Sequence, residues 1–151
     1  MLFKLLTRLK LLRPVESFLV RFAGYSVVSR HISKQSGVPY VPTMMLTTIG
    51  CRSGVLRSVP LFYFSDGANY VLIGSKGGAP AHPSWYPNLV ADPHAWVQVK
   101  RKRVAVTAEV VEGEDRERLW AVAAAAYPPY HEYQERAAPR EIPVVRLRRS
   151  K

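Results

Sequence analysis

Hydrophobic residues follow two helical patterns at the start of this 151-residue chain. In residues 1–13, leucines recur at helical spacing and the basic residues lie largely on the other side, which predicts a basic amphipathic helix. Apolar residues at helical spacing continue over 15–35, and Gly37 follows as a candidate C-terminal cap, so we expect a second helix there. Pro14 either ends the first helix or begins the second at its first turn.

From residue 43 the pattern changes to short segments rich in Thr, Val, Ile, Tyr and Phe, which glycine-containing turns separate. Such segments are typical of antiparallel strands. We expect strands over 43–49, 58–64, 70–75, 95–99, 104–111 and 142–148. A short helix is expected within 83–91, and a longer one after Gly113 that Pro128 and Pro129 end before a tyrosine-rich turn. These elements predict one α+β unit built on a small barrel or a strongly bent sheet.

The cysteine count and the lengths of the apolar runs exclude several classes of protein. Cys51 is the single cysteine, so no intrachain disulfide can form, which fits a reducing compartment such as the cytoplasm. No Cys/His cluster has the spacing of zinc ligands, so we expect no metal. No run of about 18 uncharged apolar residues exists, so we expect no transmembrane helix.

The net charge of +11 is concentrated at the two ends of the chain. Residues 1–13 and 146–151 each carry four basic residues and no acid. This distribution favours contact with an anionic surface, or anion capture at particular sites, over nucleic-acid binding, for which the chain lacks a recognisable motif. The first helix either lies on the inner face of the membrane, as a peripheral contact, or packs its leucines on protein. The sequence leaves both interpretations open.

Three segments carry candidate binding chemistry. The turn TTIGCRSGVLRS, residues 47–58, combines backbone N–H groups with Arg52, Arg57 and serine hydroxyls, which suit an anion, although an ordinary polar hairpin is the alternative. The loop GSKGGAPAHPSWYPNL, residues 74–89, holds too much glycine and proline for a strand or helix. Its glycines allow a close backbone approach, and Lys76 either faces an anionic ligand or is solvated.

The third segment is AYPPYHEYQ, residues 126–134, whose three tyrosines form either a pocket wall with O–H donors or a half-buried aromatic patch. No nucleophile–base pair and no compelling carboxylate pair is visible in the sequence. An enzyme built from these residues would therefore take its chemistry from a cofactor.

These segments, in unbroken order from Val41 to Leu147, resemble the deazaflavin-dependent nitroreductases, which are class A flavin/deazaflavin oxidoreductases of actinobacteria that use coenzyme F420. The segments SKGGAPAHPSWYPNL and YPPYHEYQ are the most specific. The resemblance implies a split β-barrel related to FMN-binding barrels. It implies hydride transfer from the reduced deazaflavin to a quinone such as menaquinone, an activated enone or a nitroaromatic compound. The helical segment would span 1–38 and the deazaflavin-binding domain 39–151.

The resemblance also implies roles for residues by their position. The expected contacts of the cofactor tail are Cys51, Arg52, Ser53, Arg57, Ser58, Val59, Pro60, Leu61 and Phe62. Ile73, Gly74, Ser75 and Lys76 are expected beside the deazaflavin ring, and Ser84, Trp85, Tyr86, Pro87 and Asn88 over the cofactor. Substrate-pocket residues would be Tyr127, Tyr130 and Tyr133, of which Tyr130 also reaches the cofactor. Ser75 and Tyr130 are candidate catalytic hydroxyls that stabilise charge as hydride arrives.

Two positions depart from the family's usual pattern. Cys51 stands where a basic residue is usual, and Pro87 replaces a usual leucine. Both bear on the contacts with the cofactor tail. The alternative functions are a non-catalytic carrier of a cofactor or lipid on the same barrel, and a relative that binds FMN or haem.

Overall fold

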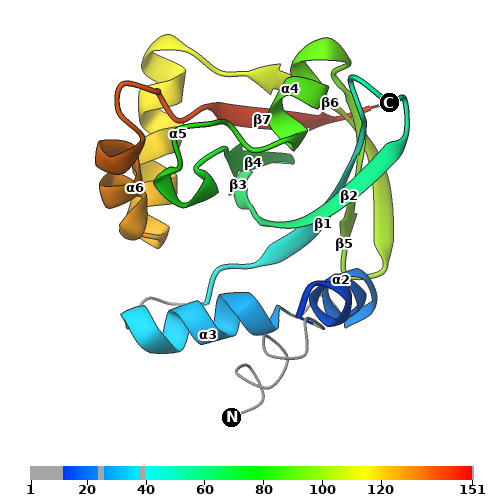
Figure 1. Cartoon of the computed structure of the whole chain (residues 1–151), viewed down its shortest axis with the longest axis horizontal. Coiled ribbons are helices and arrows are strands. Elements are labelled where there is room, and N and C mark those ends of the chain that lie inside the picture. The colour runs from blue at the N-terminus through cyan, green and yellow to red at the C-terminus, as the bar shows by residue number, and fades with distance from the viewer. Residues whose placement is uncertain (1–11, 24–25, 38–39, 151) are drawn as a thin grey trace.

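The computed structural model describes residues 12–23, 26–37 and 40–150, whose arrangement is shown in Figure 1. The strands are β1 (Thr43–Ile49), β2 (Leu56–Phe62), β3 (Phe64–Asp66), β4 (Asn69–Ile73), β5 (His94–Val99), β6 (Lys102–Val110) and β7 (Val144–Arg149). The helices are α2 (Leu12–Ala23), α3 (Val27–Ser36), α4 (Trp85–Ala91), α5 (Gly113–Ala126) and α6 (Pro129–Ala137), with one 3-10 turn, η1 (Lys76–Gly78). Residues 1–11, which hold most of the expected first helix, lie outside the described residues.

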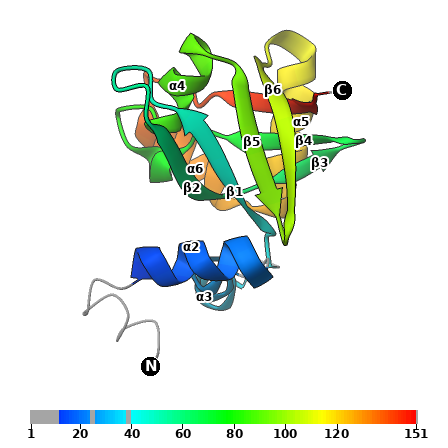
Figure 2. The same ribbon diagram turned by 90° about the vertical axis from the view of Figure 1, so that its right-hand side faces the viewer.

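The described strands form one antiparallel sheet in the order β2-β1-β5-β6-β7-β4-β3. The sheet curls strongly, so that β1 and β2 fold toward β4 and β3, while α2 and α3 lie together at one end of the curl (Figures 1 and 2). β2 and β3 are the two edges of the sheet, because no ladder joins them. This architecture confirms the predicted α+β class with a bent antiparallel sheet.

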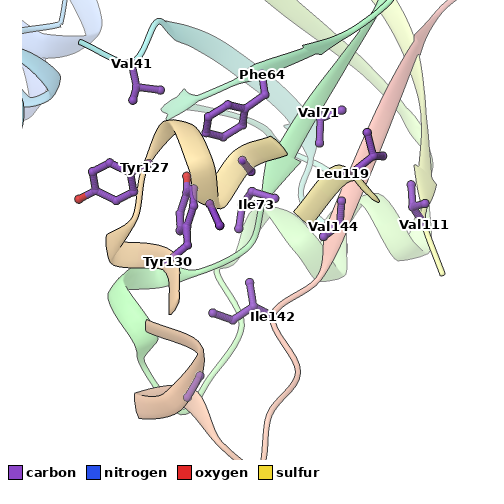
Figure 3. Close-up of a cluster of buried hydrophobic side chains, with 13 residues drawn as sticks. Val41, Phe64, Val71, Ile73, Val111, Leu119, Tyr127, Tyr130, Ile142 and Val144 are labelled. Atoms are coloured by element: carbon purple, nitrogen blue, oxygen red, sulfur yellow. The ribbon is translucent and has the colours of Figure 1, made fainter. Parts of the chain in front are cut away.

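Two apolar clusters fill the molecule. The first lies inside the curl, where α4 packs on the sheet, and consists of Met44, Leu46, Leu72, Trp85, Leu89, Ala95, Val97, Val106, Val145 and Leu147. The second lies between α5, α6 and the β3–β4–β7 part of the sheet, and Figure 3 shows it. Alternation along the strands explains this division, because successive side chains of β4 and β7 point into different clusters.

The prediction of one helix over 15–35 is wrong, because the segment forms the two helices α2 and α3. Ser26 begins the second helix: its backbone is extended and its hydroxyl accepts a hydrogen bond from the Ser29 N–H at 2.8 Å. Gly37 ends α3 with φ of 67°, as expected of a left-handed C-terminal cap. Pro14 lies in the first turn of α2, which settles the choice that the sequence left open.

The prediction of a tyrosine-rich turn after Pro129 is also wrong, because these residues form α6. The proline pair that ends α5 starts α6: Pro128 precedes the helix and Pro129 is its first residue, where a missing N–H costs nothing. The expected strand over 58–64 is in fact β2 and the start of β3. Between them the Tyr63 N–H bonds the Pro42 carbonyl at 3.1 Å, and the chain then leaves β1 to pair with β4.

Candidate functional site

A cavity of about 950 Å³ lies between the β1–β2 turn, the first half of β2, the start of α4, and the helices α2 and α3. Its lining consists of Pro14, Glu16, Ser17, Val28, Thr48, Gly50, Cys51, Arg52, Ser53, Arg57, Ser58, Val59, Pro60, Ser84, Trp85, Pro87 and Asn88. The structure therefore brings together two segments that lie apart in the sequence, residues 48–60 and 84–88. It adds a third wall, from the N-terminal helices, that we did not expect.

The β1–β2 turn is built by its own glycines. The Gly50 N–H bonds the Val55 carbonyl at 2.8 Å, and the Gly54 N–H bonds the Gly50 carbonyl at 2.8 Å. A Cβ on Gly50 would lie 2.7 Å from the Ser53 hydroxyl, and Gly54 has φ of 68°. Both glycines are thus required by the turn, whether or not a ligand approaches it.

Asn88 of α4 fixes this turn to the helix. Its Oδ1 accepts the backbone N–H of Cys51 at 2.9 Å, and its Nδ2 donates to the Thr48 hydroxyl at 3.0 Å. The side chain is only 7% exposed, so both halves of the amide are used by protein groups. Asn88 therefore shapes the cavity wall, and its amide has little left to offer a ligand.

Arg52 and Arg57 supply the positive charge of the cavity. Both are exposed, and neither has an ion-pair partner among the described residues. Other arginines are paired, as when Arg146 contacts Asp66 at 3.0 Å. Arg52 lies in the β1–β2 turn, Arg57 lies on β2 opposite Thr48, and both side chains line the cavity. Two guanidinium groups without protein partners suit an anionic ligand such as a phosphate or carboxylate.

Glu16 is the single acid of the cavity lining, and its carboxylate bonds groups at the start of α3. Its carboxylate accepts from the Ser26 hydroxyl, from the Val27 N–H at 2.9 Å and from the Val28 N–H at 3.3 Å. Glu16 thereby caps the N-terminus of α3 from α2 and is only 4% exposed. It holds the two helices together rather than facing an anion.

The remaining predicted cofactor residues lie outside this cavity lining. Leu61 and Phe62 continue along β2 toward the tyrosine cluster, and Tyr86 packs its ring against that of His82 at 4.7 Å. Ile73 is buried at the end of β4, and Gly74, Ser75 and Lys76 lead into η1. The distance from Arg57 to Phe62 along an extended strand is roughly 17 Å, so β2 connects two parts of an elongated site.

The glycines of the 74–82 loop serve protein packing. A Cβ on Gly74 would lie 2.6 Å from the Pro143 ring, and one on Gly78 would lie 2.8 Å from the Tyr133 carbonyl of α6. Gly78 also has φ of 81°. The backbone at Gly74 and Gly78 therefore lies close to Pro143 before β7 and to α6, and these contacts within the protein explain both glycines. The exposed Lys76 has no ion-pair partner among the described residues, so its ammonium group is available to a ligand.

The three tyrosines do converge, but mostly inside the protein. Tyr130 is 3% exposed and Tyr127 is 4% exposed, and their rings lie 4.9 Å apart. The Tyr127 and Tyr133 hydroxyls are 3.1 Å apart, and the Tyr127 hydroxyl points away from the cluster (Figure 3). Burial raises the pKa of Tyr127 and of Tyr130 far above the ordinary value. Both phenols thus keep their protons and are able to donate a hydrogen bond.

Sequence reasoning missed Arg140, which organises the 74–82 loop from the far end of the chain. The side chain donates to the carbonyls of Gly74, Ser75 and Ala79. It also missed the wall formed by Pro14, Ser17 and Val28. No local motif marks these residues, because their partners lie far away in sequence. The sequence offered one indication of a role for Arg140, its position two residues before the predicted strand that begins with IPVV.

Comparison with known proteins defines the class of barrel. A solved "F420-H2 Dependent Reductase (FDR-A)" has a TM-score of 0.64 and 44% identity, and covers 70% of this chain and 92% of its own. A haem-binding protein from Mycobacterium smegmatis has a TM-score of 0.55 with 17% identity, over 83% of this chain and 52% of its own, and shows the fold alone. The predicted split β-barrel is confirmed.

The family follows from the sequence comparisons. The family model described as "F420H(2)-dependent quinone reductase" matches residues 25–148, and the chain belongs to this family. F420H(2)-dependent quinone reductase Rv1261c from Mycobacterium tuberculosis is 40% identical over 111 residues, which cover 72% of this chain and 74% of the relative. The resemblance to deazaflavin-dependent enzymes is thereby confirmed, and the chain is an F420H2-dependent reductase.

The residues present fit coenzyme F420. A cofactor with an anionic tail and a flat ring needs cationic donors at one end and an apolar wall at the other. Arg52 and Arg57 provide the donors without competing ion pairs, and Trp85, which is 4% exposed, provides an aromatic wall of the same cavity. Within the described ranges, no group of His, Cys, Asp and Glu side chains is arranged to hold a metal ion, and no helix is long and apolar enough to cross a membrane.

Proposed function

We propose that this reductase binds the F420 tail at the β1–β2 turn and passes hydride to a quinone of the menaquinone type, with activated enones and nitroaromatic compounds as further acceptors. The observation that carries the proposal is the free edge of β2, which has Arg57 at its start, Arg52 in the turn before it, and the tyrosine cluster at its end. Neither arginine has an ion-pair partner in the part of the chain that the structure describes. The family description supports the quinone as acceptor.

Each group of residues has a defined task in this proposal. Arg52 and Arg57 bind the anionic tail, together with the hydroxyls of Ser53 and Ser58 and the N–H groups of the turn. The residues of β2 and the start of α4 hold the cofactor along the strand and exclude water, which hydride transfer requires. The bound reduced deazaflavin supplies the hydride. The chain itself supplies binding, orientation and hydrogen-bond donors.

Ser75 and Tyr130 remain the proposed catalytic donors. Neither hydroxyl has a hydrogen-bond partner among the described residues, and Tyr130 keeps its proton because its pKa is raised by burial. A hydroxyl that donates to the acceptor oxygen would stabilise the charge that develops there. Tyr130 lies almost entirely within the aromatic cluster, between Phe64 at 6.0 Å and Trp120 at 6.1 Å, so its contact with an acceptor requires the cluster to open.

The function is tested by titrating oxidised F420, FMN and FAD against the purified protein while following intrinsic tryptophan fluorescence. Tight binding of F420 alone, followed by oxidation of F420H2 on addition of a menaquinone analogue, supports the proposal. Preferential binding of FMN would overturn the cofactor assignment. Binding of F420H2 without its oxidation by any acceptor would indicate a carrier.

A second part of the proposal concerns the membrane. The β5–β6 hairpin is uniformly basic over residues 100–103, at its tip and the start of β6, and it lies beside α2, where the Gln98 side chain donates to the Arg21 carbonyl at 2.7 Å. The basic stretch 1–13 runs into the start of the same helix. Peripheral attachment here would bring the site near a lipid-soluble quinone. Removal of residues 1–11 should abolish sedimentation with anionic liposomes, and unchanged sedimentation would refute this part.

A further inference from the structure

Arg140 makes the most extensive set of side-chain contacts that the 74–82 loop receives. Nε donates to the Ala79 carbonyl at 3.0 Å, and Nη2 donates to the Ala79 and Ser75 carbonyls at 2.8 and 2.9 Å. Nη1 donates to the Gly74 carbonyl at 3.1 Å and contacts Nδ1 of His82 at 3.2 Å. An arginine has five N–H donors, and here all five have acceptors in one loop.

The backbone of Arg140 is itself held in place by hydrogen bonds. The Arg140 carbonyl accepts from Gln134 Nε2 at 2.8 Å, and Gln134 Oε1 accepts the Ile142 N–H at 2.8 Å. The Arg140 N–H bonds the Ala137 carbonyl at the end of α6 at 3.0 Å. Because α6 and β7 anchor the backbone on either side, Arg140 connects the rigid part of the protein to the loop.

The loop needs this support because its own backbone is strained. Lys76 has φ of 47°, a left-handed conformation that costs a residue with a side chain of the order of 1 kcal/mol or more. Within the loop, η1 supplies two short-range hydrogen bonds, from Gly78 to Ser75 at 2.9 Å and from Ala79 to Lys76 at 3.1 Å. The conformation that presents Ser75 and Lys76 therefore depends on contacts from outside the loop.

The contact of Arg140 with His82 also connects Arg140 to α4, because His82 packs against Tyr86 of that helix. The guanidinium group can only donate, so Nδ1 of His82 accepts and its proton lies on Nε2. Partial burial and the neighbouring Arg140 lower the pKa of His82, in keeping with a neutral ring. The His82 ring lies 4.7 Å from that of Tyr86 on α4. Arg140 thus connects two of the segments expected around the cofactor.

We propose that Arg140 is a positioning residue for F420 binding: its guanidinium group holds the Gly74, Ser75 and Ala79 carbonyls so that Ser75 and Lys76 face the cofactor, without touching the cofactor itself. This inference rests on the proposed function. Lysine cannot replace arginine here, because a single ammonium group cannot span three carbonyls and an imidazole at once.

Arg116 offers a matched control in the adjoining segment. Its Nη2 donates to the Ile142 carbonyl at 2.8 Å, its Nε pairs with Glu141 at 3.1 Å, and its side chain is 14% exposed. No contact joins Arg116 to the 74–82 loop among the described residues. Arg140→Lys and Arg116→Lys therefore each change an arginine that bonds a backbone carbonyl near the start of β7 or in the 74–82 loop, but only Arg140→Lys removes contacts with that loop.

The first measurement is hydrogen–deuterium exchange of the cofactor-free variants, with near-UV circular dichroism to show that both are folded. We expect Arg140→Lys to increase exchange of the 75–82 amides at least about 10-fold, the change that loss of about 1.4 kcal/mol of local stability produces. Arg116→Lys should leave these amides unchanged. Equal exchange in Arg140→Lys and the wild type would overturn the inference without reference to any cofactor.

The second measurement is the F420 dissociation constant by fluorescence titration. We expect at least a 10-fold increase for Arg140→Lys, little change for Arg116→Lys, and partial recovery when methylguanidine is added to Arg140→Ala. Equal losses in both lysine variants, or no recovery with methylguanidine, would show a merely structural role. A wild-type protein that does not bind F420 would instead refute the proposed function, so the two failures are distinguishable.

Discussion

Asn88 and Cys51 are joined across 37 residues by a hydrogen bond of 2.9 Å from the Cys51 N–H to the Asn88 side chain. The bond explains how α4, a helix at one end of the curled sheet, controls the shape of the β1–β2 turn (Figures 1 and 2). Cys51 stands where the family usually has a basic side chain. In this structure its backbone N–H is the group with a defined task, and its side chain is exposed.

Replacing Asn88 with alanine should destabilise the protein and weaken F420 binding. The change leaves the Thr48 hydroxyl, in a residue that is 1% exposed, without its donor, a loss of about 1–3 kcal/mol of unfolding free energy. Asn88→Asp is the comparison variant, because it keeps the acceptor for Cys51 and replaces the Nδ2 donor with an oxygen, to which the Thr48 hydroxyl can itself donate. Urea unfolding of the two variants separates the contributions, and a wild-type stability for Asn88→Ala would contradict the role of this bond.

Replacing Arg57 with glutamine should weaken F420 binding about 10-fold to 100-fold and leave the unfolding temperature unchanged. Among the residues that the structure describes, the Arg57 guanidinium group has no ion-pair partner to lose, whereas a charge-assisted hydrogen bond to an anion contributes about 1.5–3 kcal/mol. Arg148→Gln removes the same charge from an exposed side chain that pairs with Glu109 at 2.7 Å. If both variants lose the same affinity in the fluorescence titration, the effect comes from net charge and not from the site.

Gly78→Ala should destabilise the protein more than Gly67→Ala does. Both glycines have positive φ, 81° and 61°, so both substitutions carry the backbone cost of about 1 kcal/mol. A Cβ at Gly78 would also lie 2.8 Å from the Tyr133 carbonyl, whereas nothing lies within 4 Å of one at Gly67. Thermal unfolding of the two variants measures the difference, and equal shifts would show that α6 moves aside without cost.

Asp66 should stabilise the protein above about pH 4 and lose its effect in acid. Hydrogen bonding to Arg118, and the charges of Arg118 and Arg146, lower its pKa below the ordinary 3.8. A carboxyl whose folded-state pKa is depressed contributes stability above the unfolded-state pKa, and this is lost as pH falls through the folded value. Asp66→Asn should therefore be less stable than the wild type at pH 7 and approach it as the pH falls below 3.8 and through the lowered pKa of the folded state.

Urea unfolding at several pH values tests this pH dependence. The exposed Glu135 has no ion pair among the described residues, so Glu135→Gln should follow the wild type throughout. A difference between Asp66→Asn and the wild type that stays constant from pH 7 to pH 3 would show that packing, and not charge, is lost.

The strands were predictable because their segments are rich in Thr, Val, Ile, Tyr and Phe and the turns between them contain glycine. The β1–β2 turn and the α4 segment were predictable as parts of one site because both belong to specific motifs. The break between α2 and α3 was missed because the apolar spacing is helical both before and after Ser26. A single serine within such a pattern does not by itself indicate that one helix ends and another begins. α6 was missed because the proline pair ends one helix and also starts the next, and only tertiary packing of Tyr130 decides between a turn and a helix.

The support of the site was harder to predict than its lining. Arg140 acts on carbonyls more than 60 residues earlier in the chain. Backbone carbonyls have no side-chain signature, so nothing in the sequence of residues 74–79 indicates that an arginine binds them. The same holds for Glu16. In the sequence it is one acid among others, and its role as the cap of α3 is visible only once α2 and α3 lie side by side.

The position of β2 at the edge of the sheet has a cost for solubility. A strand with an unpaired edge can add a strand from another molecule and so start aggregation. Pro60 lies in the middle of β2, opposite Met45, and it has no N–H to offer such a partner. The same strand can therefore stay open to a small ligand while it resists extension by a second polypeptide.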